Sequence, residues 1–173
     1  MARWIKNRIE LAQYFEELGF IEGAEIGVCD GRYSEILRSH VHRVWAIDNW
    51  ESRWRSVEQA ARDRLGNEAI IKLPSVQAAD KFAEESLDFV FIDANHSYEA
   101  VKEDIEAWTP KVKPGGIVSG HDYYLTRHGN YGVIEAVNEY VDKHGYVLQF
   151  TRWDLDGHED DKQPCWYFKK EIE

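Results

Sequence analysis

Two groups of polar residues stand where two buried strands are expected to end. Each group directly follows an apolar run. The first group consists of Asp93, Asn95 and His96, and the second consists of His121 and Asp122. A near-continuous apolar run is typical of a strand that is covered on both faces of a parallel sheet. Ligands of open parallel sheets bind beyond the carboxyl ends of the strands, so these polar residues are the first candidates for chemistry.

The elements that must position these residues follow from an alternation of short apolar runs with helical patterns. Such alternation favours βαβ units, whose right-handed crossovers place strands side by side in parallel. The pattern predicts strands over residues 24–28, 43–47, 69–73, 87–92 and 116–119. It predicts helices over residues 6–18, 33–38, 56–65, 76–82, 99–108 and 133–144.

The end of the chain departs from this alternation. Residues 145–150 and 164–170 have strand patterns, and a polar, acidic segment without helical character separates them. Two strands joined without a crossover helix form an antiparallel pair. We therefore predict an α/β fold, a Rossmann-like doubly wound sheet of seven strands that is mostly parallel, with one antiparallel strand near the C-terminus. One domain is expected over residues 1–173, with the helix in residues 1–20 covering the sheet or the site.

Composition and charge limit the classes of partner. The chain has 173 residues and a formal net charge of -11, and this acidic excess would repel nucleic-acid phosphates. No apolar stretch approaches the length of a membrane span, and the first residues lack the apolar core of a secretion signal. A cytoplasmic protein that binds neither nucleic acid nor a membrane is expected, and no pattern specifies or excludes an oligomer.

A glycine-containing turn follows the first predicted strand. Glu25, Gly27 and Gly31 frame it, and Asp30 lies inside it. Glycine allows a tight turn and a close approach to a ligand, whereas a carboxylate in the turn would repel a pyrophosphate. The second strand ends at Asp48, whose carboxylate can accept hydrogen bonds from two ribose hydroxyls or can cap the following turn. An uncharged or cationic ligand with a ribose is therefore favoured.

Together with the segment LPSVQAADKF after the third strand, these features resemble the class I S-adenosylmethionine-dependent methyltransferases. The ligand of that family carries a sulfonium and an ammonium and no phosphate, which suits an acidic pocket. The resemblance implies that Asp93 also belongs to the cofactor site. It assigns the methionine portion to Glu25, Gly27 and Gly31, the ribose to Asp48, and the adenine to Ser75 and Val76.

The segments IDANHSYEAVKEDIEAW and KPGGIVSGHDYY resemble a narrower subfamily, the small-molecule O-methyltransferases of the cephalosporin and macrolide-sugar type. The resemblance implies a divalent metal bound by Asp93, His121 and Asp122, and His96 as the catalytic base beside Asp93. An imidazole with an ordinary pKa of about 6.5 suits the removal of a proton from a substrate hydroxyl. His121 replaces an acid of the subfamily, and its imidazole suits zinc, iron or manganese better than magnesium.

Three functions are compatible with these features. The leading hypothesis is S-adenosylmethionine-dependent O-methylation of a small hydroxylated molecule. The second is a protein that binds or cleaves S-adenosylmethionine without a methyl acceptor. The third, an NAD-dependent dehydrogenase, is disfavoured because the turn lacks the G-x-G-x-x-G pattern and is acidic.

Two further segments contain a pair of tryptophans and a pair of glycines. Trp50 and Trp54 lie one helical turn apart, a spacing more typical of core packing than of ligand contact. Residues 126–132 contain two glycines, and we interpret them as a mobile flap over the acceptor.

Overall fold

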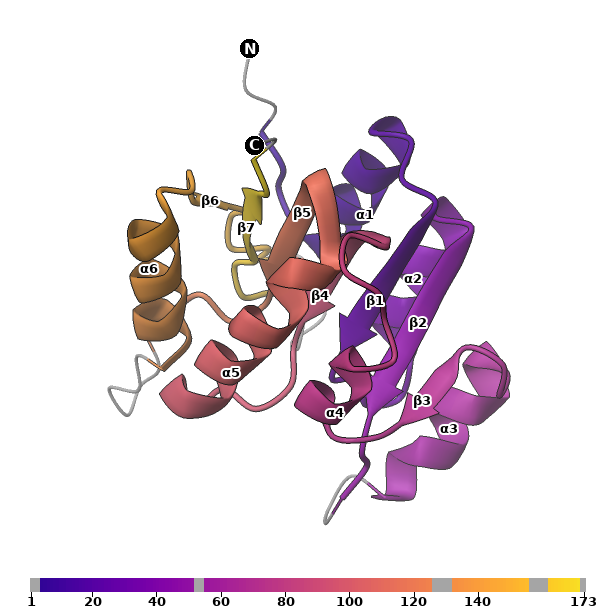
Figure 1. Ribbon diagram of the computed structural model, residues 1–173. Coiled ribbons are helices and arrows are strands. Elements are labelled where there is room, and N and C mark those ends of the chain that lie inside the picture. The colour runs from indigo at the N-terminus through magenta and orange to yellow at the C-terminus, as the bar shows by residue number, and fades with distance from the viewer. Residues whose placement is uncertain (1–3, 52–54, 126–131, 156–161, 172–173) are drawn as a thin grey trace.

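The computed structural model describes residues 4–51, 55–125, 132–155 and 162–171 (Figure 1). Within these residues, seven strands form one sheet in the order β3-β2-β1-β4-β5-β7-β6. Strands β1 to β5 run parallel to one another, whereas β7 runs antiparallel to both β5 and β6. The strands are β1 (Glu22–Ile26), β2 (Arg43–Asp48), β3 (Ile70–Lys72), β4 (Leu87–Ile92), β5 (Val112–Gly120), β6 (Gln149–Phe150) and β7 (Trp166–Lys169).

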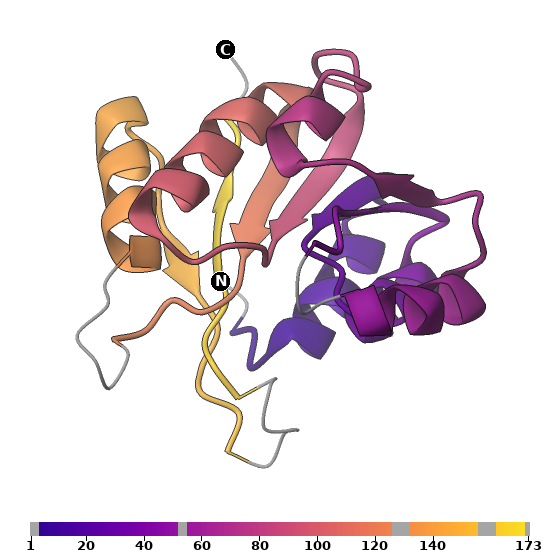
Figure 2. The same ribbon diagram turned by 90° about the horizontal axis from the view of Figure 1, so that it is seen from below.

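Helices cover both faces of the sheet, as Figure 2 shows. One layer contains α4, α5 and α6, and the other contains α1, α2 and α3. Their bounds are α1 (Arg8–Glu17), α2 (Arg32–His40), α3 (Arg55–Leu65), α4 (Ser75–Ala79), α5 (Tyr98–Trp108) and α6 (Gly132–His144), and a short 3₁₀ helix, η2 (Thr109–Lys111), follows α5.

The two layers bury separate apolar clusters against the sheet. Val90, Ile105 and Trp108 belong to the cluster beneath α4 to α6. Phe15 of α1 stacks on Phe89 of β4 at a ring-centroid distance of 4.3 Å in the opposite cluster. Alternate residues of β4 therefore pack on opposite faces of the sheet, which explains why this strand is apolar at every position except Asp88.

The observed architecture confirms the predicted fold class. A doubly wound sheet of seven strands contains one reversed strand, β7, close to the C-terminus. Strand β6 is shorter than the six residues predicted for it. The reason lies in the end of α6, where Gly145 adopts a φ of +71° and the amide of Tyr146 donates to the carbonyl of Val141, so these residues close the helix instead of pairing.

Parts of two segments singled out from the sequence lie outside the residues that the structure describes. Trp54 and residues 126–131 of the predicted flap lie outside the described residues. Trp50 is described and is 1% exposed in a cluster with Ala61 and Leu65, so it packs in the core. Within the described part of the chain, no helix has the length and apolar character to cross a membrane.

Candidate active site at the carboxyl edge of the sheet

The hydrogen-bond ladder of the sheet extends one residue past the strands and fixes the start of each site loop. The amide of Gly27 donates to the carbonyl of Ile47 at 2.8 Å, and that of Asp93 to the carbonyl of Ile26 at 2.7 Å. The amide of His121 donates to the carbonyl of Ile92 at 3.0 Å. Because β2, β1, β4 and β5 are consecutive strands of the sheet, these loops begin side by side at one edge.

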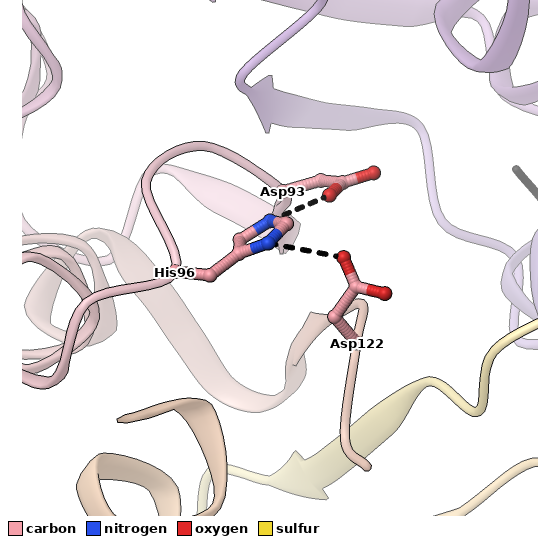
Figure 3. Close-up of side chains that lie close together, drawn as sticks. All are labelled: Asp93, His96 and Asp122. Atoms are coloured by element: carbon pink, nitrogen blue, oxygen red, sulfur yellow. Dashed lines mark hydrogen bonds and ion pairs between the residues drawn. The ribbon is translucent and has the colours of Figure 1, made fainter. Parts of the chain in front are cut away.

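His96 lies between two carboxylates at this edge (Figure 3). Its Nε2 is 3.3 Å from Oδ1 of Asp93, and its Nδ1 is 3.2 Å from Oδ2 of Asp122. Asn95 and Ser97 shape the loop that carries His96, since the Asn95 side chain accepts from the amide of Ser97 and Ser97 caps α5. Asp122 has a φ of +58°, a left-handed conformation that turns the chain sharply as β5 ends.

The carboxylates change the acid–base properties of the imidazole. The hydrogen bond to Asp93 raises the pKa of His96 above its usual value, and the Asp122 charge adds to this effect while burial opposes it. Burial by itself would raise the pKa of Asp93, but the hydrogen bond from His96 and the nearby His121 and Arg8 outweigh burial and lower it. The arrangement therefore stabilises an imidazolium between two carboxylates.

His121 lies beneath the same carboxylates. Its Nδ1 is 3.5 Å from Oδ1 of Asp122 and 3.8 Å from Oδ2 of Asp93, and its side chain is 3% exposed. Among the described residues, Asp93, His96 and Asp122 form a group that could hold a metal ion, with one ligand atom of each within 4.8 Å of the others. The structure thus gathers the three predicted metal ligands and places His96 with the two carboxylates.

The glycine turn after β1 packs against the start of the β4 loop. Gly27 has a φ of +89°, and a Cβ at this position would lie 2.1 Å from the carbonyl oxygen of Asp93. Gly31 has a φ of +83° at the N-terminus of α2. Asp48 holds the turn: its Oδ2 accepts from the amides of Val28 and Cys29, and its Oδ1 accepts from the amide of Trp50. The capping function considered for Asp48 is therefore present, and its predicted contact with a ribose stays a prediction.

Glu25 is buried beneath the turn instead of facing solvent. It is 2% exposed, and the hydroxyl of Ser34 in α2 donates to its carboxylate. Burial is the largest cause that raises the pKa of Glu25, from 4.5 to about 8, and Asp93 and Asp48 add to the increase. Glu25 therefore holds a proton at neutral pH.

Replacing Glu25 by Gln is expected to flatten the pH dependence of stability. Between pH 4.5 and 8 the unfolded wild type ionises Glu25 while the folded protein keeps it protonated, so the free energy of unfolding falls as pH rises through this window. As pH rises from 4.5 to 8, we expect the free energy of unfolding of the variant to increase relative to that of the wild type by on the order of 2–4 kcal/mol. Urea unfolding of both proteins between pH 4.5 and 8 measures this difference, and parallel curves would contradict it.

Ser75 and Val76, predicted near an adenine, form the first turn of α4 after β3. The Ser75 hydroxyl accepts from Nε1 of Trp108 at 2.9 Å and also bonds to Asp104, a buried acid whose pKa is raised to about 6 mainly by burial. Val76 is 44% exposed. Ser75 thus ties α4 to α5, while Val76 presents an apolar side chain to the surface.

Two contacts at the site were not predicted from the sequence. Arg8 of α1 reaches Asp93, with Nη1 at 3.6 Å from Oδ2. Gly132 begins α6 where a Cβ would lie 2.5 Å from the carbonyl oxygen of His96, so α6 approaches the His96 loop closely. Arg8 lies 85 positions before Asp93 in the sequence and belongs to no recognisable motif. Gly132 is one of the two glycines of the predicted flap, but its contact with the His96 loop was not indicated by the sequence.

Residues 24–123 match the family of proteins described as "Methyltransferase domain". This match covers more than half of the 173 residues. The chain therefore belongs to the methyltransferase-domain family, with the Rossmann-like sheet of the class I enzymes that use S-adenosylmethionine as the methyl donor. The narrower subfamily predicted from the sequence is not established by this match.

Solved structures with the same fold include methyltransferases of several kinds. An O-methyltransferase from Bacillus cereus in complex with SAH is 17% identical, with a TM-score of 0.66 over 94% of this chain and 80% of that one. An rRNA methylase from Streptococcus thermophilus is 16% identical, with a TM-score of 0.68 over 98% and 100%. The N-methyltransferase NodS from Bradyrhizobium japonicum is 17% identical, with a TM-score of 0.65 over 95% of both chains. At these identities the likeness shows the fold.

A curated relative shares a shorter segment. It is an uncharacterized protein, y4gI, from Sinorhizobium fredii, and it is 34% identical over 60 residues, which are 35% of this chain. The matched segment spans only 7% of the length of that relative.

Proposed function

We propose that the protein transfers the methyl group of S-adenosylmethionine to a hydroxyl of a small molecule, with His96 as the general base. The observation that carries the proposal is the position of His96 between Asp93 and Asp122 at the carboxyl edge of a methyltransferase sheet. One domain spanning residues 1–173, acting in the cytoplasm, is part of the proposal.

The residues around the glycine turn have the chemistry that this donor requires. S-adenosylmethionine, when bound, supplies an electrophilic methyl group on a cationic sulfur. Asp93 and Asp48 provide negative charge at neighbouring strand ends, and the turn at Gly27 brings backbone close to where a ligand would lie. We assign the cofactor site to Glu25, Gly27, Gly31, Asp48, Ser75, Val76 and Asp93.

His96 would take the hydroxyl proton. The neutral imidazole accepts this proton on a ring nitrogen, and the acceptor oxygen becomes a nucleophile for the methyl group. Asp93 and Asp122 then stabilise the imidazolium that forms, because each carboxylate lies within 3.3 Å of a ring nitrogen. Holding the two reactants in line would supply a large share of the acceleration.

A divalent metal would change the part that His96 plays. Asp93, His96 and Asp122 have the spacing of a metal site, and two carboxylates with an imidazole suit zinc, manganese or iron better than magnesium. Such an ion would lower the pKa of a bound hydroxyl. A ring nitrogen of His96 that binds the ion is no longer a base, so the two mechanisms are mutually exclusive at that nitrogen.

The lining of the hollow beside His96 suits a small hydroxylated acceptor. It consists of Asn95, His96 and His121 together with apolar side chains such as Val101 and Trp166. A few polar groups among apolar side chains are typical of sites that bind small molecules. The net charge of -11 disfavours RNA, although an rRNA methylase is among the proteins with this fold.

Calorimetric titration with S-adenosylmethionine and S-adenosylhomocysteine, first in chelator and then with Mn²⁺ or Zn²⁺, tests the cofactor site. Binding in chelator supports the proposal, and absence of binding under every condition would remove it. NADH in the same titration tests the dehydrogenase alternative.

Production of S-adenosylhomocysteine tests the acceptor class. It should require one member of a panel of hydroxylated small molecules, such as sugars, phenols and catechols. Transfer to an rRNA fragment, or cofactor breakdown without any acceptor, would replace the proposed reaction by one of the other functions.

A further inference from the structure

Arg8 places a positive charge among the acidic residues of the site. Its guanidinium lies 3.6 Å from Asp93, and its side chain is 11% exposed. This separation is longer than a hydrogen bond, so the contact is an attraction between charges without the paired N–H···O geometry that arginine forms with a carboxylate. Asp93 also contacts His96 and approaches His121, so Arg8 shares this carboxylate with two imidazoles.

The position of Arg8 is fixed by the helix that follows the glycine turn. The guanidinium carbon lies 4.8 Å from the centre of the Tyr33 ring, and the Tyr33 hydroxyl donates to the backbone carbonyl of Arg8 at 2.9 Å. Tyr33 is in the first turn of α2, and Asp93 follows β4, so Arg8 is held between the two elements that flank the Gly27 turn. Asn7 caps α1 directly before it.

The methionine portion of the cofactor needs such a cation. It carries an ammonium and a sulfonium, which acids attract, and also an α-carboxylate, which Asp93 and Asp48 would repel. Glu25 holds a proton at neutral pH because burial raises its pKa to about 8, so it does not neutralise Arg8. The planar fork of a guanidinium matches a carboxylate in two parallel hydrogen bonds.

We propose that Arg8 binds the α-carboxylate of the methionine portion of S-adenosylmethionine. The inference rests on the proposed function, because it requires that the protein bind this cofactor. It makes Arg8 a binding residue that α1 contributes to a site otherwise built from strand ends and from the loops and helix starts that follow them.

The unmodified protein provides the first test. Decarboxylated S-adenosylmethionine keeps the sulfonium and the ammonium and lacks only the α-carboxylate. Calorimetry should show that the wild type binds S-adenosylmethionine about tenfold to a hundredfold more tightly than the decarboxylated compound, as expected for a charged hydrogen-bonded pair. Equal affinity for the two compounds would overturn the proposal without any variant having to fold. Failure to bind either one would instead overturn the proposed function.

Variants then identify the residue responsible. Arg8→Met should lose most of the preference for S-adenosylmethionine while leaving the affinity for the decarboxylated compound unchanged or slightly higher. Arg8→Lys keeps the charge without the fork and should be intermediate. Arg32→Met is the matched control. Arg32 follows the Gly27 turn directly, but its guanidinium pairs with Asp30 at 2.8 Å and its side chain is half exposed.

The pattern of losses separates recognition from a structural role. If Arg8→Met lowers the affinity for both compounds equally, Arg8 has only a structural role in the site and the proposal fails. If Arg32→Met removes the preference instead, the carboxylate lies at Arg32 and the proposal fails as well.

Discussion

Replacing His96 by Gln is expected to lower kcat by at least a hundredfold while the affinity for S-adenosylhomocysteine stays the same. General-base catalysis contributes roughly 10²–10⁴-fold, and Gln can keep one hydrogen bond to the site carboxylates without accepting a proton. The measurement is S-adenosylhomocysteine formation with the acceptor found by screening, in chelator, beside calorimetry of the cofactor product. His40→Gln is a suitable control, since His40 also pairs with a carboxylate, Glu16, but on the surface between α1 and α2.

The pH profile separates a base from a residue that only positions the acceptor. The base must be neutral, and the Asp93 hydrogen bond raises the pKa of His96, so kcat/KM should rise with pH through a midpoint above 6.5. Removing the Asp122 charge by Asp122→Asn removes one cause of that increase, and the midpoint should move to lower pH. An unshifted profile, or a His96→Gln enzyme of normal activity, would show that another group accepts the proton. Activity that is lost in chelator and restored by Mn²⁺ or Zn²⁺ would favour the metal mechanism.

Replacing Gly27 by Ala should destabilise the fold and weaken cofactor binding. The new methyl group would lie 2.1 Å from the carbonyl oxygen of Asp93 and 2.6 Å from Cα of Ala94, both backbone atoms, and the residue would also have to keep a φ of +89°. Overpacking and left-handed backbone together are expected to cost about 3–5 kcal/mol. Urea unfolding measures this loss, and calorimetry of the folded fraction measures the affinity for S-adenosylhomocysteine, which we expect to fall by more than tenfold.

Gly66→Ala is the matched control for the energetic cost of placing alanine in a left-handed backbone conformation. Gly66 has a φ of +73°, and its added Cβ would meet no atom within 4 Å, so only the conformational cost of about 1–2 kcal/mol should remain. A Gly27→Ala protein as stable as Gly66→Ala would show that the turn can move away from the β4 loop. Unchanged cofactor affinity in such a protein would remove Gly27 from the binding site.

Much of the candidate site could be predicted because strand ends in a parallel sheet share one edge. Asp93 and Asp122 come from different strands, yet once the periodicity defines β4 and β5 as neighbours, their side chains must be close. The same reasoning placed Gly27 and Asp48 at this edge, and it applied to His96 because the loop after β4 is short. Their roles in binding and catalysis are still predictions.

The orientation of buried side chains could not be predicted in this way. Glu25 points beneath the turn to Ser34, and Ser75 points into the contact between α4 and α5, because each hydroxyl or carboxylate there finds a hydrogen-bond partner away from water. Sequence spacing defines the face of a strand or a helix, but it does not define which polar partner will be within reach.

By itself, the sequence determined the order of elements, the class of fold and the edge at which the chemistry was to be sought. These follow from local periodicity and from the geometry that parallel strands impose on every crossover. Only the tertiary structure decided that His96 lies between Asp93 and Asp122 and that Arg8 joins them from α1. Both contacts depend on how loops and a helix that are distant in sequence pack together around the Asp93 carboxylate. A local sequence pattern cannot predict a contact such as that of Arg8 with Asp93, which spans 85 positions.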